Sequence, residues 1–235
     1  VQVLSITGGE DSFFADKGWL FGLLLASSVG AVIIGGIRSI ANVASKIVPF
    51  MAVLYVFSAI LIIAMSAEHL LGAIGLIVSS AFEASSVTGG AVGAMIIGFQ
   101  RAVFSNEAGI GSASIAHSAV KTDEPVTEGL VSLLEPFIDS MVICTLTSLV
   151  IVTTAYPNGL MDGGLEGIAL TSAAFAHHIS WSPYVMSIAA LLFAFSTSIA
   201  WAYYGLKGWT YLFGEGVITQ LIFKGIFCGF ICLGC

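Results

Sequence analysis

The residues with the clearest chemical potential lie in the middle of a long apolar segment, residues 86–120. Its centre, residues 98–112, contains an arginine, a glutamate, an asparagine and two serines. Ser and Asn side chains compete with a helix for backbone hydrogen bonds, and Gly109 and Gly111 each lower helix propensity by up to about 1 kcal/mol. One straight helix over this segment would be about 52 Å long, far more than a bilayer's hydrocarbon thickness. We therefore expect a discontinuous helix that breaks between Phe104 and Gly109.

A break of this kind has binding chemistry. Backbone can leave a helix at membrane depth only where it lines protein or a wet cavity, and transporters use such breaks as binding sites. The outer half, about residues 86–103, would end in free carbonyl groups that suit an ammonium group or a metal cation. The inner half, about residues 109–120, would begin with free N–H groups that suit a carboxylate. A zwitterion beside a cation would match both ends; the alternative is a kinked structural helix with a satisfied Arg–Glu pair.

Two charges lie at the expected break, Arg101 before it and Glu107 within it. The break would let them meet, or Arg101 could meet Glu135 or Asp139 instead. Such a pair would act as a gate or would neutralise buried charge. We favour this gating or structural role over direct contact with a substrate.

A second polar cluster lies near residues 195–204. Thr197, Trp201 and Tyr204 share one helix face through i, i+4 and i+7 spacing. Hard cations prefer oxygen ligands, so the hydroxyls of Thr197 and Ser198 plus a carbonyl could complete a sodium site. The alternative is that these hydroxyls bond to their own helix.

Composition indicates which elements position these groups. The chain of 235 residues is 57% hydrophobic and 9% charged, whereas a soluble domain carries about 25% charged residues. This excludes a water-soluble globule, a disordered chain and a disulfide scaffold, and 7 Lys+Arg against 14 Asp+Glu exclude a nucleic-acid surface. Strand-like alternation is absent, so we expect an all-α, multi-pass transmembrane bundle in the cell membrane.

Six apolar segments are expected to cross the bilayer: residues 19–37, 47–67, 86–120, 130–155, 182–206 and 217–235. Residues 70–82 are too short to cross and suit a re-entrant or interfacial piece. The cations of the connections would then share one side, which the positive-inside rule makes cytoplasmic: Arg38, Lys46, Lys121, Lys207 and Lys224. Residues 156–181 become an extracellular connection with a surface helix over 165–179, which ends in the interfacial polar residues His177 and His178.

Four stretches carry a resemblance to a known family, the sodium:alanine/glycine symporters. These are GFQRAVFSNEAGIGSASIAHSAVKTDEP at residues 98–125, GLVSLLEPFIDSMVICTLTSLVIV at 129–152, FAFSTSIAWAYYG at 193–205 and GGIRSIANVASKIVPFMA at 35–52. The resemblance covers nearly the whole chain after about residue 20. It implies a leucine-transporter-type fold of inverted repeats, of which residues 1–235 would supply about helices four to nine as a single partial transporter domain.

The resemblance also implies functional residues. Thr197 and Ser198 fall where that fold places hydroxyl ligands for sodium, the coupling ion, and no other cofactor is implied. The first discontinuous helix of the family has no counterpart here, so we expect the chain to be a fragment of a longer protein. The pocket for a small neutral amino acid, alanine or glycine, would be lined by Phe104, Ser105, Asn106, Gly109 and Trp201.

Sodium-coupled symport by alternating access is the function that the sequence favours, and we expect no enzyme. One alternative is proton coupling, with Glu107, Glu135 or Asp139 titrating. A remote one is an intramembrane serine protease that uses Ser112 and His117. Five residues on one helix would place that pair about 140° apart, facing away from each other.

Overall fold

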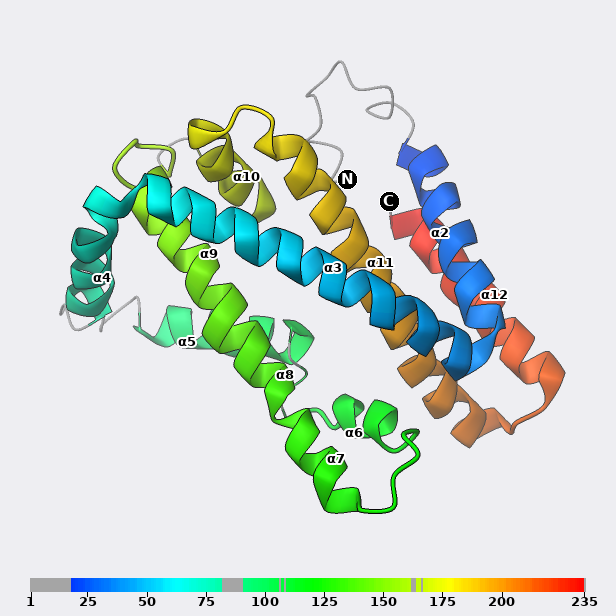
Figure 1. Ribbon diagram of the computed structural model, residues 1–235. Helices are drawn as coiled ribbons and strands as arrows, with labels where there is room; N and C mark the ends of the chain where they lie inside the picture. The colour runs from blue at the N-terminus through cyan, green and yellow to red at the C-terminus, as the bar shows by residue number, and fades with distance from the viewer. Residues whose placement is uncertain are drawn as a thin grey trace. The chain divides into compact units, whose positions relative to one another are not determined.

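The computed structural model describes residues 18–81, 91–105, 107, 109–161, 164–165 and 167–234 (Figure 1). Every regular element within these ranges is a helix, as expected for an apolar chain whose backbone groups must bond to one another in lipid. The chain divides into two compact units. Unit 1 contains residues 1–57, 166–172 and 179–235, and unit 2 contains residues 58–165 and 173–178.

Unit 1 is built on α2 (Gly18–Ile34), the first part of α3 (Gly36–Met65), α11 (Ser182–Phe213) and α12 (Val217–Gly234). α2 packs on α12 and α11, and α11 packs on α12. Gly205 of α11 permits the last contact, because a Cβ there would lie 2.7 Å from the ring of Phe223. The indole N–H of Trp209 donates to the carbonyl of Thr219 at 3.1 Å and fixes the turn between the two helices.

Unit 2 begins with the end of α3 and contains α4 (Ala67–Ala81), α5 (Ala91–Ser105) and α6 (Ser112–His117). A long helical segment follows as α7 (Pro125–Ser132), α8 (Leu134–Pro136), η3 (Phe137–Cys144), α9 (Thr145–Val150) and η4 (Ile151–Ala155). Its stretches η3 and η4 have π-helical hydrogen bonding. π-Helical turns are rare in proteins, and those that occur are often found at functional sites.

Among the residues that the structure describes, four helical segments are long and apolar enough to cross a membrane: Gly36–Met65, Pro125–Ala155, Ser182–Phe213 and Val217–Gly234. Each overlaps one of the expected crossings. The first expected crossing corresponds to α2, which has only 17 residues, and the expected segment 86–120 contains the separate helices α5 and α6. Residues 70–82, expected to be too short to cross, fall largely within the 15-residue α4.

The first connection is not a loop, which corrects the expectation. Arg38 and Lys46 lie within the 30-residue α3. The turn before it is at Gly35, and Gly36, the first residue of α3, has φ +70°. Residues 37–46 contain no glycine or proline that would end a helix. The helical pattern therefore runs on through the charged stretch.

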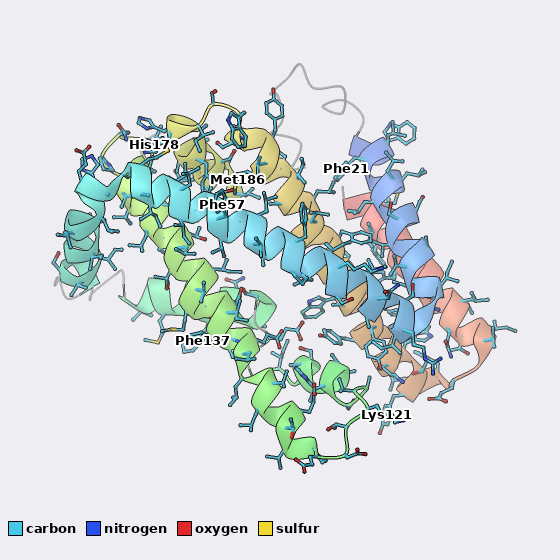
Figure 2. All side chains as sticks on the ribbon, viewed as in Figure 1. Phe21, Phe57, Lys121, Phe137, His178 and Met186 are labelled. Carbon is cyan, nitrogen blue, oxygen red and sulfur yellow. The ribbon has the colours of Figure 1, made fainter. Side chains whose placement is uncertain are left out.

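The expected surface helix at 165–179 is observed as α10 (Gly167–His178), which belongs partly to each unit. It is not wholly superficial, since Phe175 is only 1% exposed. His178, labelled in Figure 2, is also more than an interfacial polar residue. Its Nε2 lies 2.7 Å from the Oγ of buried Ser66, at the turn between α3 and α4. The Ser66 hydroxyl also lies 3.5 Å from that of Thr154 in η4.

Candidate functional site

A break in the helix is the central feature of the site. α5 ends at Ser105 and α6 begins at Ser112, as two separate ribbons in Figure 1. Of the residues described between them, three have left-handed backbone: Glu107 with φ +58°, Gly109 with φ +83° and Gly111 with φ +80°. Glycine adopts such angles without strain. A glutamate there costs about 1–3 kcal/mol, and such strain clusters at functional sites.

The break starts later than expected. Phe104 and Ser105 are the last two residues of α5 rather than part of the unwound stretch. No glycine or proline precedes them in residues 99–105, so nothing local ends the helix before Ser105. Asn106 lies outside the described residues, as do the side chains of Arg101 and Phe104.

Glu107 is buried within the break. It is 7% exposed, and its carboxylate accepts a hydrogen bond from the Oγ of Ser112 at 2.6 Å. A buried carboxylate requires such donors. The protein's own negative charge therefore lies beside the start of α6, where a substrate carboxylate was expected. This charge favours a cation over an anion at that position, which corrects the expected polarity of the inner half.

The end of α5 is tied to the π-helical stretch. The hydroxyl of Ser105 donates a hydrogen bond to the carboxylate of Asp139 in η3. Ser105 was expected to face a substrate, and Asp139 was considered only as a partner for Arg101 or as a titrating group. The two residues are 34 positions apart, and no local pattern in the sequence indicates their contact. A second carboxylate thus stands at the break.

The other end of α6 carries a histidine between two carboxylates. Nδ1 of His117 lies 2.6 Å from Oε1 of Glu128 in α7, and its Nε2 lies 3.9 Å from Oε2 of Glu135 in α8. Glu128 was missed by the sequence analysis, although it follows His117 by only 11 positions across a short connection. Because His117 pairs with Glu128 and Ser112 with Glu107, the structure gives no support to a Ser112–His117 nucleophile and base.

A cavity of about 540 Å³ lies beside this cluster, between α6 and α7. The connection between the two helices, residues 118–124, contributes Ser118, Val120 and Thr122 to the lining and also contains Lys121, which is labelled in Figure 2. Hydroxyl, imidazole and carboxylate groups give the cavity its polar lining: Ser114, His117, Ser118, Thr122, Glu128 and Ser132. The end of α6 that holds His117 is therefore accessible to water-sized molecules.

The second predicted cluster lies in unit 1, on α11. The hydroxyl of Ser198 donates to the carbonyl of Ala194 at 2.7 Å, within its own helix, as the alternative interpretation anticipated. Thr197 is exposed. The rings of Trp201 and Tyr204 meet edge to face with centroids 6.0 Å apart, consistent with the shared face. The predicted residues therefore fall in two units, with Phe104, Ser105 and Gly109 in unit 2 and Thr197, Ser198 and Trp201 in unit 1.

Membrane-capable helices and a helix interrupted at a buried charge define an integral membrane protein of the helical-bundle class, and such interruptions are typical of secondary transporters. The sodium:alanine symporter family matches residues 1–235, and the chain belongs to this family. The resemblance seen in the sequence is thereby confirmed.

Three relatives illustrate the similarity. The sodium/alanine symporter AgcS of Methanococcus maripaludis is 42% identical over 218 residues, which cover 91% of this chain and 48% of the relative. The probable sodium/glutamine symporter GlnT of Bacillus subtilis is 35% identical, covering 95% of this chain and 48% of the relative. The amino-acid carrier protein AlsT of Bacillus subtilis is 34% identical, covering 96% and 50%. The chain thus spans about half the length of these relatives, whose names are those of transporters rather than enzymes.

Proposed function

We propose that the protein is a cation-coupled secondary transporter in the cell membrane that carries small neutral amino acids by alternating access. The observation that carries this proposal is the helix break between Ser105 and Ser112, with Glu107 buried inside it. Backbone freed from a helix at membrane depth can bind a small polar solute. Membership of the sodium:alanine symporter family supports the same function.

Sodium is the proposed coupling ion, and alanine or glycine the proposed substrate. The two carboxylates at the break, Glu107 and Asp139, supply negative charge that a cation or the ammonium group of an amino acid would balance. The proposed pocket residues are Phe104, Ser105, Asn106, Gly109 and Trp201, and the proposed sodium ligands are Thr197 and Ser198. Family resemblance is what brings the residues of α11 into this site, in a leucine-transporter-type fold.

Uptake into liposomes tests this function. The protein, at the full length that its gene encodes, is reconstituted and given labelled alanine with and without an inward sodium gradient at fixed pH. We expect accumulation only with the gradient, and a loss of about tenfold in Ser105→Ala, since a hydrogen bond to a charged group contributes about 1.5–3 kcal/mol.

Ser79→Ala is the matched control, because this hydroxyl bonds only to Leu76 in its own helix, α4. Equal losses in both variants would contradict the site. Competition by unlabelled glycine, serine and glutamine then ranks the substrates.

Proton coupling is the second candidate, because His117 lies between two carboxylates near the break. Alanine uptake that persists without sodium but follows an inward proton gradient would favour it. Uptake that needs sodium at every pH would exclude the proton as the driving ion.

A further inference from the structure

His117 is held in a way that suits its protonated form. Both ring nitrogens face carboxylates, Nδ1 at 2.6 Å from Glu128 and Nε2 at 3.9 Å from Glu135. A neutral imidazole can donate one hydrogen bond to Glu128 but carries no charge. The imidazolium ion keeps this hydrogen bond and also attracts the Glu135 carboxylate, which at 3.9 Å forms an ion pair rather than a hydrogen bond. We propose that His117 is a proton-binding site and that the bound proton locks α6 to α7 and α8.

The charges that surround His117 are negative. Glu128 has an 18% exposed side chain and Glu135 a 41% exposed one, so the nearer pair is the better shielded from water. Glu107 and Asp139 also act electrostatically on Glu135. Among the side chains that the structure describes, His117 is the cation-forming group that pairs with Glu128 and Glu135. A positive charge here relieves their mutual repulsion.

The lock acts on a short and lightly held element. α6 has six residues; a carboxylate holds its first residue through the Ser112–Glu107 bond, and carboxylates hold its last residue, His117. When the proton leaves, the imidazole keeps at most its hydrogen bond to Glu128, and Glu135 loses the positive charge that faces it. The proton exchanges through the cavity, which His117 and Glu128 both line. Release of this end frees α6 and the connection at 118–124 to move.

The consequence for transport rests on the proposed function. α6 would then be the inner half of the broken helix, and its displacement would open the substrate site toward the cavity. Acid on that side of the membrane would hold the site closed. A proton bound ten times more tightly by the locked form shifts the equilibrium about tenfold.

Thiol accessibility tests the lock without any transport. In the full-length protein, reconstituted in lipid nanodiscs, every native cysteine is first replaced by alanine. A single new cysteine is then introduced by Ser118→Cys, at a residue that lines the cavity. Its rate of labelling by a water-soluble maleimide is divided by that of an exposed reference, Ser45→Cys in α3, which cancels the intrinsic pH dependence of the thiol. We expect this ratio to rise about tenfold between about pH 5.5 and about pH 8, the range in which histidine changes charge.

Substitutions assign the effect. In His117→Gln and in Glu128→Gln the labelling ratio should stay high at both pH values, because neither variant retains the ion pair between His117 and Glu128. His69→Gln is the matched control. His69 also pairs with a carboxylate, that of the exposed Glu68, but both residues lie on α4. This variant should keep the pH dependence of the labelling ratio. A constant ratio in the unsubstituted protein, or an unchanged dependence in both His117→Gln and Glu128→Gln, would overturn the proposal.

The same experiment separates this inference from the proposed function. Labelling that follows pH in a protein without sodium-driven uptake would leave the lock standing and contradict the transport proposal. Sodium-driven uptake together with labelling that does not depend on pH would support the transport proposal and contradict the lock. Two conservative variants with different chemistry are used so that misfolding of one, seen as aggregation in gel filtration, still leaves a test.

Discussion

Glu107 combines two conditions that its residue type disfavours, a left-handed backbone and a buried carboxylate. The hydroxyl of Ser112 compensates for part of this by donating a hydrogen bond at 2.6 Å. Both residues lie at the break, so their bond fixes the geometry of the turn that leads into α6. At this scale, one hydroxyl determines whether a buried charge is satisfied.

Ser112→Ala should therefore be destabilising. It leaves the Glu107 carboxylate without this donor, and an unsatisfied buried acceptor costs about 1–3 kcal/mol. The thermal unfolding midpoint in detergent measures the loss. Ser118→Ala is the control, because its exposed hydroxyl bonds only to the carbonyl of Ile115 and its removal should change stability by less than about 0.5 kcal/mol. Equal midpoints for the two variants would show that the Glu107 contact contributes nothing.

At the scale of elements, close packing of α11 on α12 depends on the absence of a side chain at one position. A Cβ at Gly205 would meet the Phe223 ring at 2.7 Å, whereas a Cβ at Gly208, one turn later, would meet nothing within 4 Å. The two glycines share a helix and differ in their neighbours. They form a matched pair for testing the contact.

Gly208→Ala should stabilise the protein by up to about 1 kcal/mol, since alanine is the better helix former. Gly205→Ala gains the same propensity but forces the Phe223 ring aside, and overpacking costs about 1–3 kcal/mol. We expect a lower unfolding midpoint for Gly205→Ala than for Gly208→Ala. The reverse order would mean that α12 shifts freely away from α11.

Elements also show what a sequence can reveal here and what it cannot. The cause of the break is local, because Gly109 and Gly111 both adopt positive φ, so composition alone points to the right segment. The position at which the break starts does not follow from composition, because α5 includes Ser105 as its last residue. The Ser105–Asp139 and His117–Glu128 contacts arise from how α5 and α6 meet the following helical segment. No hydrophobic periodicity in the sequence predicts these two side-chain contacts.

The whole molecule presents many large apolar side chains outward. Exposed large hydrophobic residues occur on nearly every long helix. Those that are at least 69% exposed include Val53, Leu71, Val126, Ile218, Phe230 and Leu233. No residue in the membrane-capable window of α12 is buried. Leaving such surface in water is unfavourable by roughly 25 cal/mol per Å². The molecule as described therefore requires lipid, or further protein, around it.

Stability of the whole molecule should fall in acid because of His178. Burial, then the neighbouring His177 and His69, lower the pKa of His178 below its ordinary value. The folded state thus binds this proton less readily than the unfolded state, whose histidines titrate near about pH 6.5. The contribution of His178 is complete above that pH and is lost as the pH falls through the lowered pKa.

We expect the unfolding midpoint to drop below about pH 6.5 and His178→Gln to flatten that drop. Unfolding curves in detergent across this range provide the measurement. His177→Gln serves for comparison, because His177 is exposed and acts on His178 only as a secondary influence. A drop of the same size in His178→Gln would assign the acid sensitivity to other groups.

The length of α3 has a consequence for how the chain meets its solvent. Thirty residues extend about 45 Å, some 15 Å more than the hydrocarbon layer. The surplus turns are those with Arg38 and Lys46, and long basic side chains reach readily for the lipid headgroups. This end of the helix therefore stands among phosphates, where it is attracted to anionic lipids and fixes the depth at which the rest of α3 is immersed.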